Sequence, residues 1–99
     1  MPTLLEQEFR KEMISIYKRA KDEIGFVATR FIQMIDKHGG VETARILINA
    51  DNPSGGFTRL WEEHRLDLSV EALVLNPKWV TLFSSEEIAK ARQRLSEYE

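Results

Sequence analysis

The sequence predicts an all-α fold: a compact orthogonal bundle of about six or seven helices, with long helices at both ends and short helices between them. Three observations support this fold class. Apolar residues recur at spacings of three and four along most of the chain. Gly, Pro and Ser interrupt that pattern at short intervals. No segment alternates between apolar and polar residues in the way that marks a β-strand.

The length and composition indicate a single globular domain, residues 1–99. Hydrophobic residues make up 42% of the chain and charged residues 30%, a balance typical of folded rather than disordered proteins. Cysteine is absent, which excludes a disulfide framework, a thiolate zinc site and a cysteine nucleophile. The N-terminal segment lacks the features of a signal peptide, and no run approaches the roughly 18 apolar residues of a membrane span. We therefore expect a cytoplasmic protein without a membrane partner.

The first predicted helix covers residues 3–24. Thr3 and Glu6 have the spacing of a capping box, and Gly25 stands where a left-handed residue commonly ends a helix. Its apolar stripe consists of Leu5, Phe9, Met13, Ile16, Tyr17, Ala20 and Ile24. A stripe of this kind must pack against other elements, so we expect this helix to line the core.

Two further helices are predicted at residues 28–38 and 41–49, on either side of Gly39 and Gly40. A glycine turn between two helices also occurs in helix–turn–helix proteins, whose second helix reads DNA. With either glycine as the turn residue, however, two key packing positions of that motif hold unsuitable side chains. The second helix is also poor in cations that could bind phosphate. The sequence therefore favours an ordinary αα-hairpin.

The C-terminal half is predicted to contain several short helices. Residues 50–56, "ADNPSGG", give the strongest loop signal, and residues 57–64 then form a short helix with Phe57, Leu60, Trp61 and His64 on one side. Ser69 caps a second short helix, Pro77 starts one or two turns, and Ser84 with Glu87 caps the last helix. We expect Trp61 and Trp79 to anchor the core of this half.

Catalytic and metal-binding motifs are not evident. We find no nucleophile elbow, phosphate-binding loop or dinucleotide fingerprint. Neither His38 nor His64 shares a predicted helix with an acidic or histidine partner at the spacing of a metal site. We therefore expect no enzymatic activity, no cofactor and no metal. An enzyme site assembled from His64, Arg65 and Asp67 is a weaker alternative.

The charge and the helical pattern favour a non-enzymatic protein–protein interaction or regulatory module, which would bind an unidentified protein or a second copy of itself. A nucleic-acid-binding protein with a degenerate helix–turn–helix is the alternative. The net charge of −2 argues against it, because dedicated duplex-binding domains carry a basic excess.

Two surfaces are candidates for partner contact. The first is the basic strip, which we define as Arg10, Ile14, Lys18 and Lys21. Ile14 within this strip could contact a partner, or it could belong to a broader buried face edged by lysine stems. The second candidate comprises Arg59, Trp61 and Arg65, because Trp and Arg are enriched in binding hot spots.

Three blocks of sequence also carry a resemblance: "RFIQMIDKHGGVETARILI", "GFTRLWEEHRLDLSVEALVL" and "WVTLFSSEEIAKARQRL". On these blocks the chain resembles a family of small bacterial all-helical proteins with no known activity, over about residues 5–98. The resemblance implies a short bacterial protein. It implies no activity and assigns no functional residue.

Overall fold

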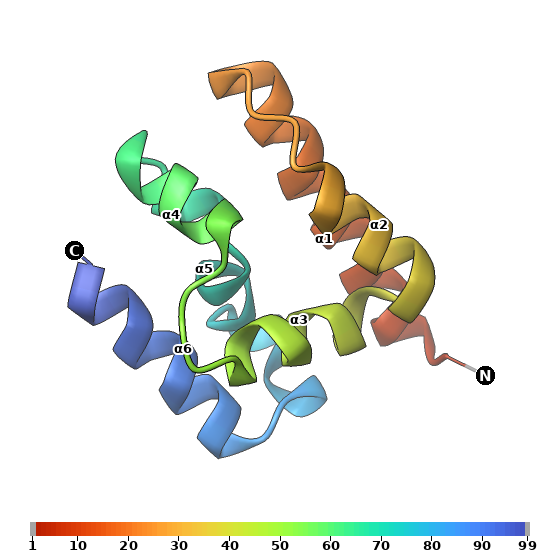
Figure 1. The fold of residues 1–99 in the computed structure, drawn as a ribbon. Helices are drawn as coiled ribbons and strands as arrows, with labels where there is room; N and C mark the ends of the chain where they lie inside the picture. The colour runs from red at the N-terminus through yellow and green to blue at the C-terminus, as the bar shows by residue number, and fades with distance from the viewer. Residues whose placement is uncertain (1, 99) are drawn as a thin grey trace.

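The computed structural model describes residues 2–98, and the prediction of an all-α bundle is confirmed (Figure 1). These residues form six α-helices and two 3-10 helices and contain no strand. In chain order the elements are α1 (Leu4–Ile24), α2 (Thr29–His38), α3 (Gly40–Asn49), α4 (Gly55–Glu62), η1 (Leu66–Leu68), α5 (Val70–Val74), η2 (Pro77–Leu82) and α6 (Ser85–Tyr98). The radius of gyration is 12.4 Å, close to the value of about 13 Å typical of a compact domain of this length.

Helix α1 begins and ends where the sequence predicts. The Thr3 hydroxyl accepts a hydrogen bond from the Glu6 amide at 3.1 Å, and the Glu6 carboxylate accepts one from the Thr3 amide at 3.2 Å. Gly25 adopts a left-handed conformation with φ 69°, and its amide donates to the Lys21 carbonyl. The buried face of α1 consists of Phe9, Met13, Ile16 and Ala20.

The two glycines between α2 and α3 have different structural roles. Gly39 has φ 83°, a region that favours glycine, and it reverses the chain. Gly40 begins α3 directly on α1: a Cβ atom at this position would lie only 2.8 Å from the Cα of Arg10. The predicted αα-hairpin is therefore present, and its second helix crosses α1 at backbone contact (Figure 1).

The main core is built around Phe9 of α1. Its ring makes edge-on contacts with Trp79 and Phe83, each with ring centroids 5.3 Å apart. Trp79 is 2% exposed, so the prediction that it anchors the C-terminal half is confirmed. These contacts join α1 to η2 and to the start of α6.

The prediction that Trp61 anchors the core is wrong, since its side chain is 44% exposed. Helix α4 directs Phe57 and Leu60 inward. The residue after Leu60 is rotated by about 100° around the helix axis, which turns Trp61 outward against Tyr98. His64 is also not part of the apolar face, because α4 ends at Glu62 and His64 is exposed with φ 58°.

The predicted loop at residues 50–56 is also shorter than expected. Ser54 caps α4, its hydroxyl accepting from the Phe57 amide at 3.0 Å, so Gly55 and Gly56 lie in the first helical turn. The caps at Ser69 and Ser84 are confirmed. Within the part of the chain that the structure describes, no helix is long and apolar enough to cross a membrane.

Candidate functional site

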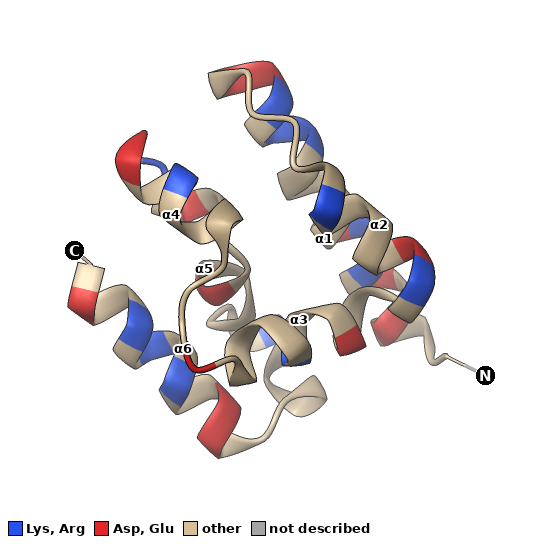
Figure 2. Ribbon diagram, viewed as in Figure 1, with Lys and Arg blue, Asp and Glu red and all other residues tan. Residues whose placement is uncertain are grey.

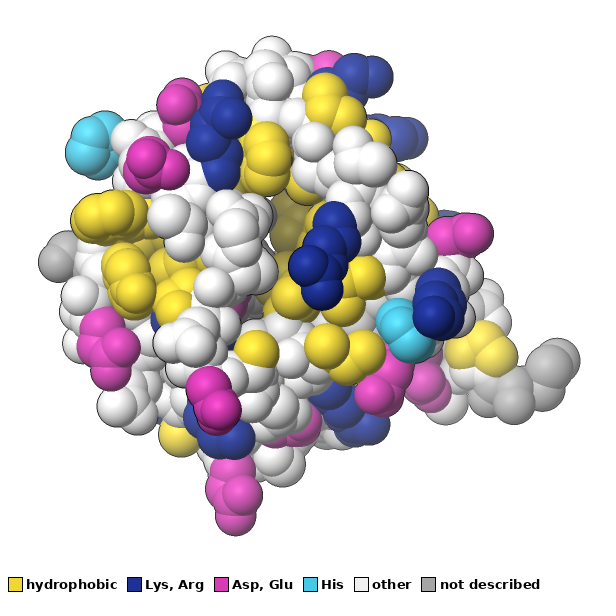
Figure 3. All heavy atoms as spheres, in the orientation of Figure 1, with side chains coloured by type: hydrophobic (Ala, Val, Ile, Leu, Met, Phe, Trp, Pro, Cys, Tyr) yellow, Lys and Arg dark blue, Asp and Glu magenta, His cyan; other side chains and the backbone are white. Residues whose placement is uncertain are grey.

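A cavity of about 510 Å³ lies between two parts of the fold that are distant in sequence. One wall comes from α2 and residues 26–28, and the opposite wall comes from residues 52–56 and α4. Ile16 and Ala20 of α1 and residues 68–71 close it from behind. Figure 3 shows a hollow near the centre of this face, with hydrophobic side chains at its bottom and a Lys or Arg side chain at its rim.

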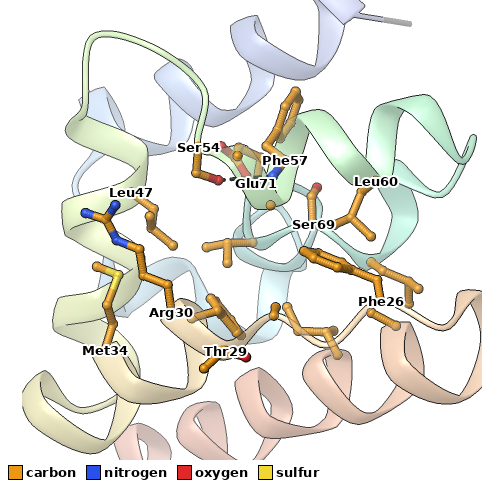
Figure 4. A pocket seen from close by; sticks show the side chains of 18 of the residues that line it. Phe26, Thr29, Arg30, Met34, Leu47, Ser54, Phe57, Leu60, Ser69 and Glu71 are labelled. Carbon is orange, nitrogen blue, oxygen red and sulfur yellow. Dashed lines mark hydrogen bonds between the residues drawn. The ribbon is translucent and has the colours of Figure 1, made fainter.

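Two positions of the α4 wall carry no side chain. Gly55 and Gly56 line the cavity without side chains, and a Cβ atom at Gly56 would lie 3.9 Å from the Phe26 ring, at ordinary contact distance. Figure 4 shows Arg30 and Met34 beside Leu47 on one side, and Phe26 with Leu60 on the other.

The inner surface of the cavity is mainly carbon, and two of its serine hydroxyls form hydrogen bonds within the protein. The Ser69 hydroxyl donates to the Leu66 carbonyl at 2.7 Å and accepts from the Ala72 amide. The Ser54 hydroxyl is occupied by the α4 cap. A molecule entering the cavity therefore meets apolar walls and few free hydrogen-bonding groups.

Glu71 is the one acidic residue among the cavity walls of the described chain, and it is 3% exposed. Its carboxylate accepts from the Arg94 guanidinium at 3.0 Å. Burial raises the pKa of Glu71, and the hydrogen bond from Arg94 opposes that rise. Arg94 also donates to the carbonyls of Leu47 and Ala50 at 2.9 and 2.6 Å. These hydrogen bonds connect α6 to α5 and to the end of α3. The Glu71 carboxylate therefore has a structural role.

The mouth of the cavity differs from its interior. Val27 and Ile46, both at the mouth, are 50% and 38% exposed. Arg30 lies among the lining residues, is exposed, and forms no ion pair or side-chain hydrogen bond with any of residues 2–98. The mouth therefore combines exposed apolar surface with one unpaired cation.

The basic strip lies on α1, away from the cavity. Arg10, Lys18 and Lys21 are exposed, whereas Ile14 is half-buried and packs against the main core. Part of the Ile14 side chain is therefore used in core packing and is not available to a partner. Figure 2 shows basic and acidic residues interspersed on the same helices rather than gathered on one of them.

The residues of the second candidate surface, Arg59, Trp61 and Arg65, differ in their contacts. Arg59 lies 5.2 Å from the centre of the Phe26 ring and pairs with Glu63 at 3.6 Å. Arg65 pairs with Glu23 at 2.7 Å and with Asp67 at 3.0 Å, which ties η1 to the end of α1. Trp61 is 44% exposed and is the one large apolar side chain of this surface.

The charges around Arg65 are used within the fold. Hydrogen bonds from Arg19 and Arg65 lower the pKa of Glu23, and the hydrogen bond from Arg65 lowers the pKa of Asp67. The His64 imidazole forms no hydrogen bond or ion pair with the residues that the structure describes, whereas Arg65 and Asp67 pair with each other. Across residues 2–98, no group of three or more His, Asp or Glu side chains is arranged to hold a metal ion.

Sequence reasoning missed the cavity, including Phe26, Arg30 and Gly56. No known protein family, curated protein or solved structure matches the chain. The resemblance to a bacterial helical family therefore stays a prediction.

Proposed function

We propose that this protein acts by binding rather than by catalysis, and that it takes a small apolar molecule into the cavity between α2 and α4. The observation that carries the proposal is the cavity itself, with a volume of about 510 Å³ and mainly carbon walls. Small-molecule sites commonly measure about 300–1,000 Å³ and are lined mostly by apolar side chains.

The shape of the cavity favours a compact molecule. Its walls come from opposite sides and α1 closes the back, so it is not an extended groove of the kind that receives a helix. Transfer of an apolar molecule from water into such a site is favourable, roughly in proportion to the apolar area removed from water. The inner hydroxyls of Ser54 and Ser69 are held by the backbone, which supports binding rather than chemistry.

Binding at this site also gives a physical basis for the regulatory role predicted from the sequence. A molecule in the cavity would contact α2 and α4 together and cover part of Val27 and Ile46 at the mouth. Occupancy would thereby change the surface that a partner meets. A protein partner, and alternatively a nucleic acid, stay predictions.

The test uses N-phenyl-1-naphthylamine, a neutral apolar dye that fluoresces when it leaves water. We expect saturable binding with one site per chain. Gly56→Leu should abolish it, because the added side chain grows from a position in contact with the Phe26 ring. Gly56→Ala makes the same backbone change without filling the space and should retain binding. Failure of the folded wild-type protein to bind the dye, or equal binding by Gly56→Leu, would contradict the proposal.

A further inference from the structure

We propose that the molecule bound in the cavity is an anionic single-chain amphiphile, with its apolar chain inside and its carboxylate paired with Arg30 at the mouth. This inference rests on the proposed binding function and adds the chemical class of the ligand.

The arginines around the cavity differ in whether they have ion-pair partners. Arg94 is bound to Glu71 behind the wall, and Arg59 is occupied by Glu63 and the Phe26 ring. Arg30 stands at the mouth without an ion-pair partner among residues 2–98. The charge of Glu71 is balanced by Arg94, so the cavity presents an uncompensated positive charge at its entrance.

The mouth of the cavity is charged, whereas its interior is mainly apolar. Arg30 projects from α2 beside Met34 and Leu47, which are apolar cavity residues (Figure 4). A guanidinium has a planar fork of N–H donors that matches a carboxylate, and its charge is permanent. A chain that fills the carbon-lined interior and ends in a carboxylate would satisfy both regions at once.

Other classes of ligand fit this distribution less well. A polar molecule would lose its hydration to walls that are mainly carbon and whose Ser69 hydroxyl is already bonded. A cationic amphiphile would be repelled by Arg30. A neutral apolar molecule would fit the interior but would gain nothing from the guanidinium, so its affinity should not depend on that residue.

The experiment compares decanoate, 1-decanol and decyltrimethylammonium as competitors of N-phenyl-1-naphthylamine at neutral pH. We expect decanoate to bind most tightly and decyltrimethylammonium most weakly. Arg30→Gln should weaken decanoate about three- to tenfold and leave 1-decanol unchanged within about twofold, as expected for a charge-assisted contact at a partly exposed site. Arg92→Gln is the matched control, because Arg92 is exposed on α6 and does not line the cavity.

Two further readouts sharpen the test. Raising the salt concentration should weaken decanoate but not 1-decanol, because salt screens exposed charges. Each added CH₂ should tighten binding by about fourfold until the chain fills the cavity. Equal loss of decanoate binding in Arg30→Gln and Arg92→Gln, or no preference for decanoate over 1-decanol, would overturn the inference while leaving the binding function intact. If neither the dye nor 1-decanol binds, the proposed function itself fails.

Discussion

Replacing Gly40 by Ala tests the backbone contact between α1 and α3. The new Cβ would lie 2.8 Å from the Arg10 Cα, 3.2 Å from its Cβ and 3.2 Å from its backbone nitrogen. The nearest of these atoms is backbone and cannot rotate away, so α1 and α3 must separate by several tenths of an ångström. Overpacking of this kind costs about 1–3 kcal/mol, against at most about 1 kcal/mol gained from the better helix propensity of Ala.

We therefore expect Gly40→Ala to lower the free energy of unfolding by about 1–2 kcal/mol. For a domain of this size, each kcal/mol corresponds to about 4–8 °C in Tm. The measurement is urea and thermal unfolding followed by circular dichroism at 222 nm.

Gly55→Ala provides the matched control for this experiment. Gly55 is also the first residue of its helix, but a Cβ there would meet no atom within 4 Å. This substitution should be neutral or stabilise the fold by up to about 1 kcal/mol. If Gly40→Ala proves as stable as Gly55→Ala, then α3 does not cross α1 at backbone contact and our account of the glycine pair is wrong.

Three other expectations concern stability. Trp79→Ala should reduce the free energy of unfolding by about 3–5 kcal/mol, because the Trp79 ring is buried. Trp61→Ala should reduce it by much less, because the Trp61 ring is half exposed. Equal losses in urea titrations would contradict the different burial of the two rings. Ile14→Asp should lower Tm clearly, because Ile14 packs on the core, whereas Lys18→Glu should leave Tm nearly unchanged. An unaltered Tm for Ile14→Asp would show that Ile14 is available for partner contact. Burial raises the pKa of Glu71 above its ordinary value of 4.5, so the folded state holds this proton more tightly than the unfolded state. The free energy of unfolding of the wild type should therefore fall relative to Glu71→Gln as the pH rises above 4.5, and parallel pH profiles would contradict that direction.

Local signals predicted the helices well. The capping pairs Thr3 with Glu6 and Ser84 with Glu87 act within four residues, so the sequence alone specifies where α1 and α6 begin. The start of α4 was placed too late, because the cap at Ser54 outweighs the low helix propensity of the two glycines that follow it.

Long-range packing could not be read in the same way. Trp61 and Leu60 both fit an apolar pattern, and only the position of the rest of the molecule decides which of them is buried. The cavity requires residues from α1 to α5 at once, and Arg30 has no neighbour in sequence that distinguishes it from an ordinary solvated charge. A cavity between helices produces no hydrophobic periodicity in the sequence from which it could be predicted.

The contacts of Arg94 have a consequence for the order in which the protein can fold during synthesis. Glu71 precedes Arg94 by 23 residues, and the carbonyls of Leu47 and Ala50 precede it by 47 and 44. A chain emerging from its N-terminus exposes all three acceptors before their shared donor exists. Until α6 arrives, burying the Glu71 carboxylate would cost its hydration without a compensating cation. A nascent chain that lacks α6 should therefore keep α5 undocked, so residues 68–71 would complete the back wall of the cavity only after α6 has been made.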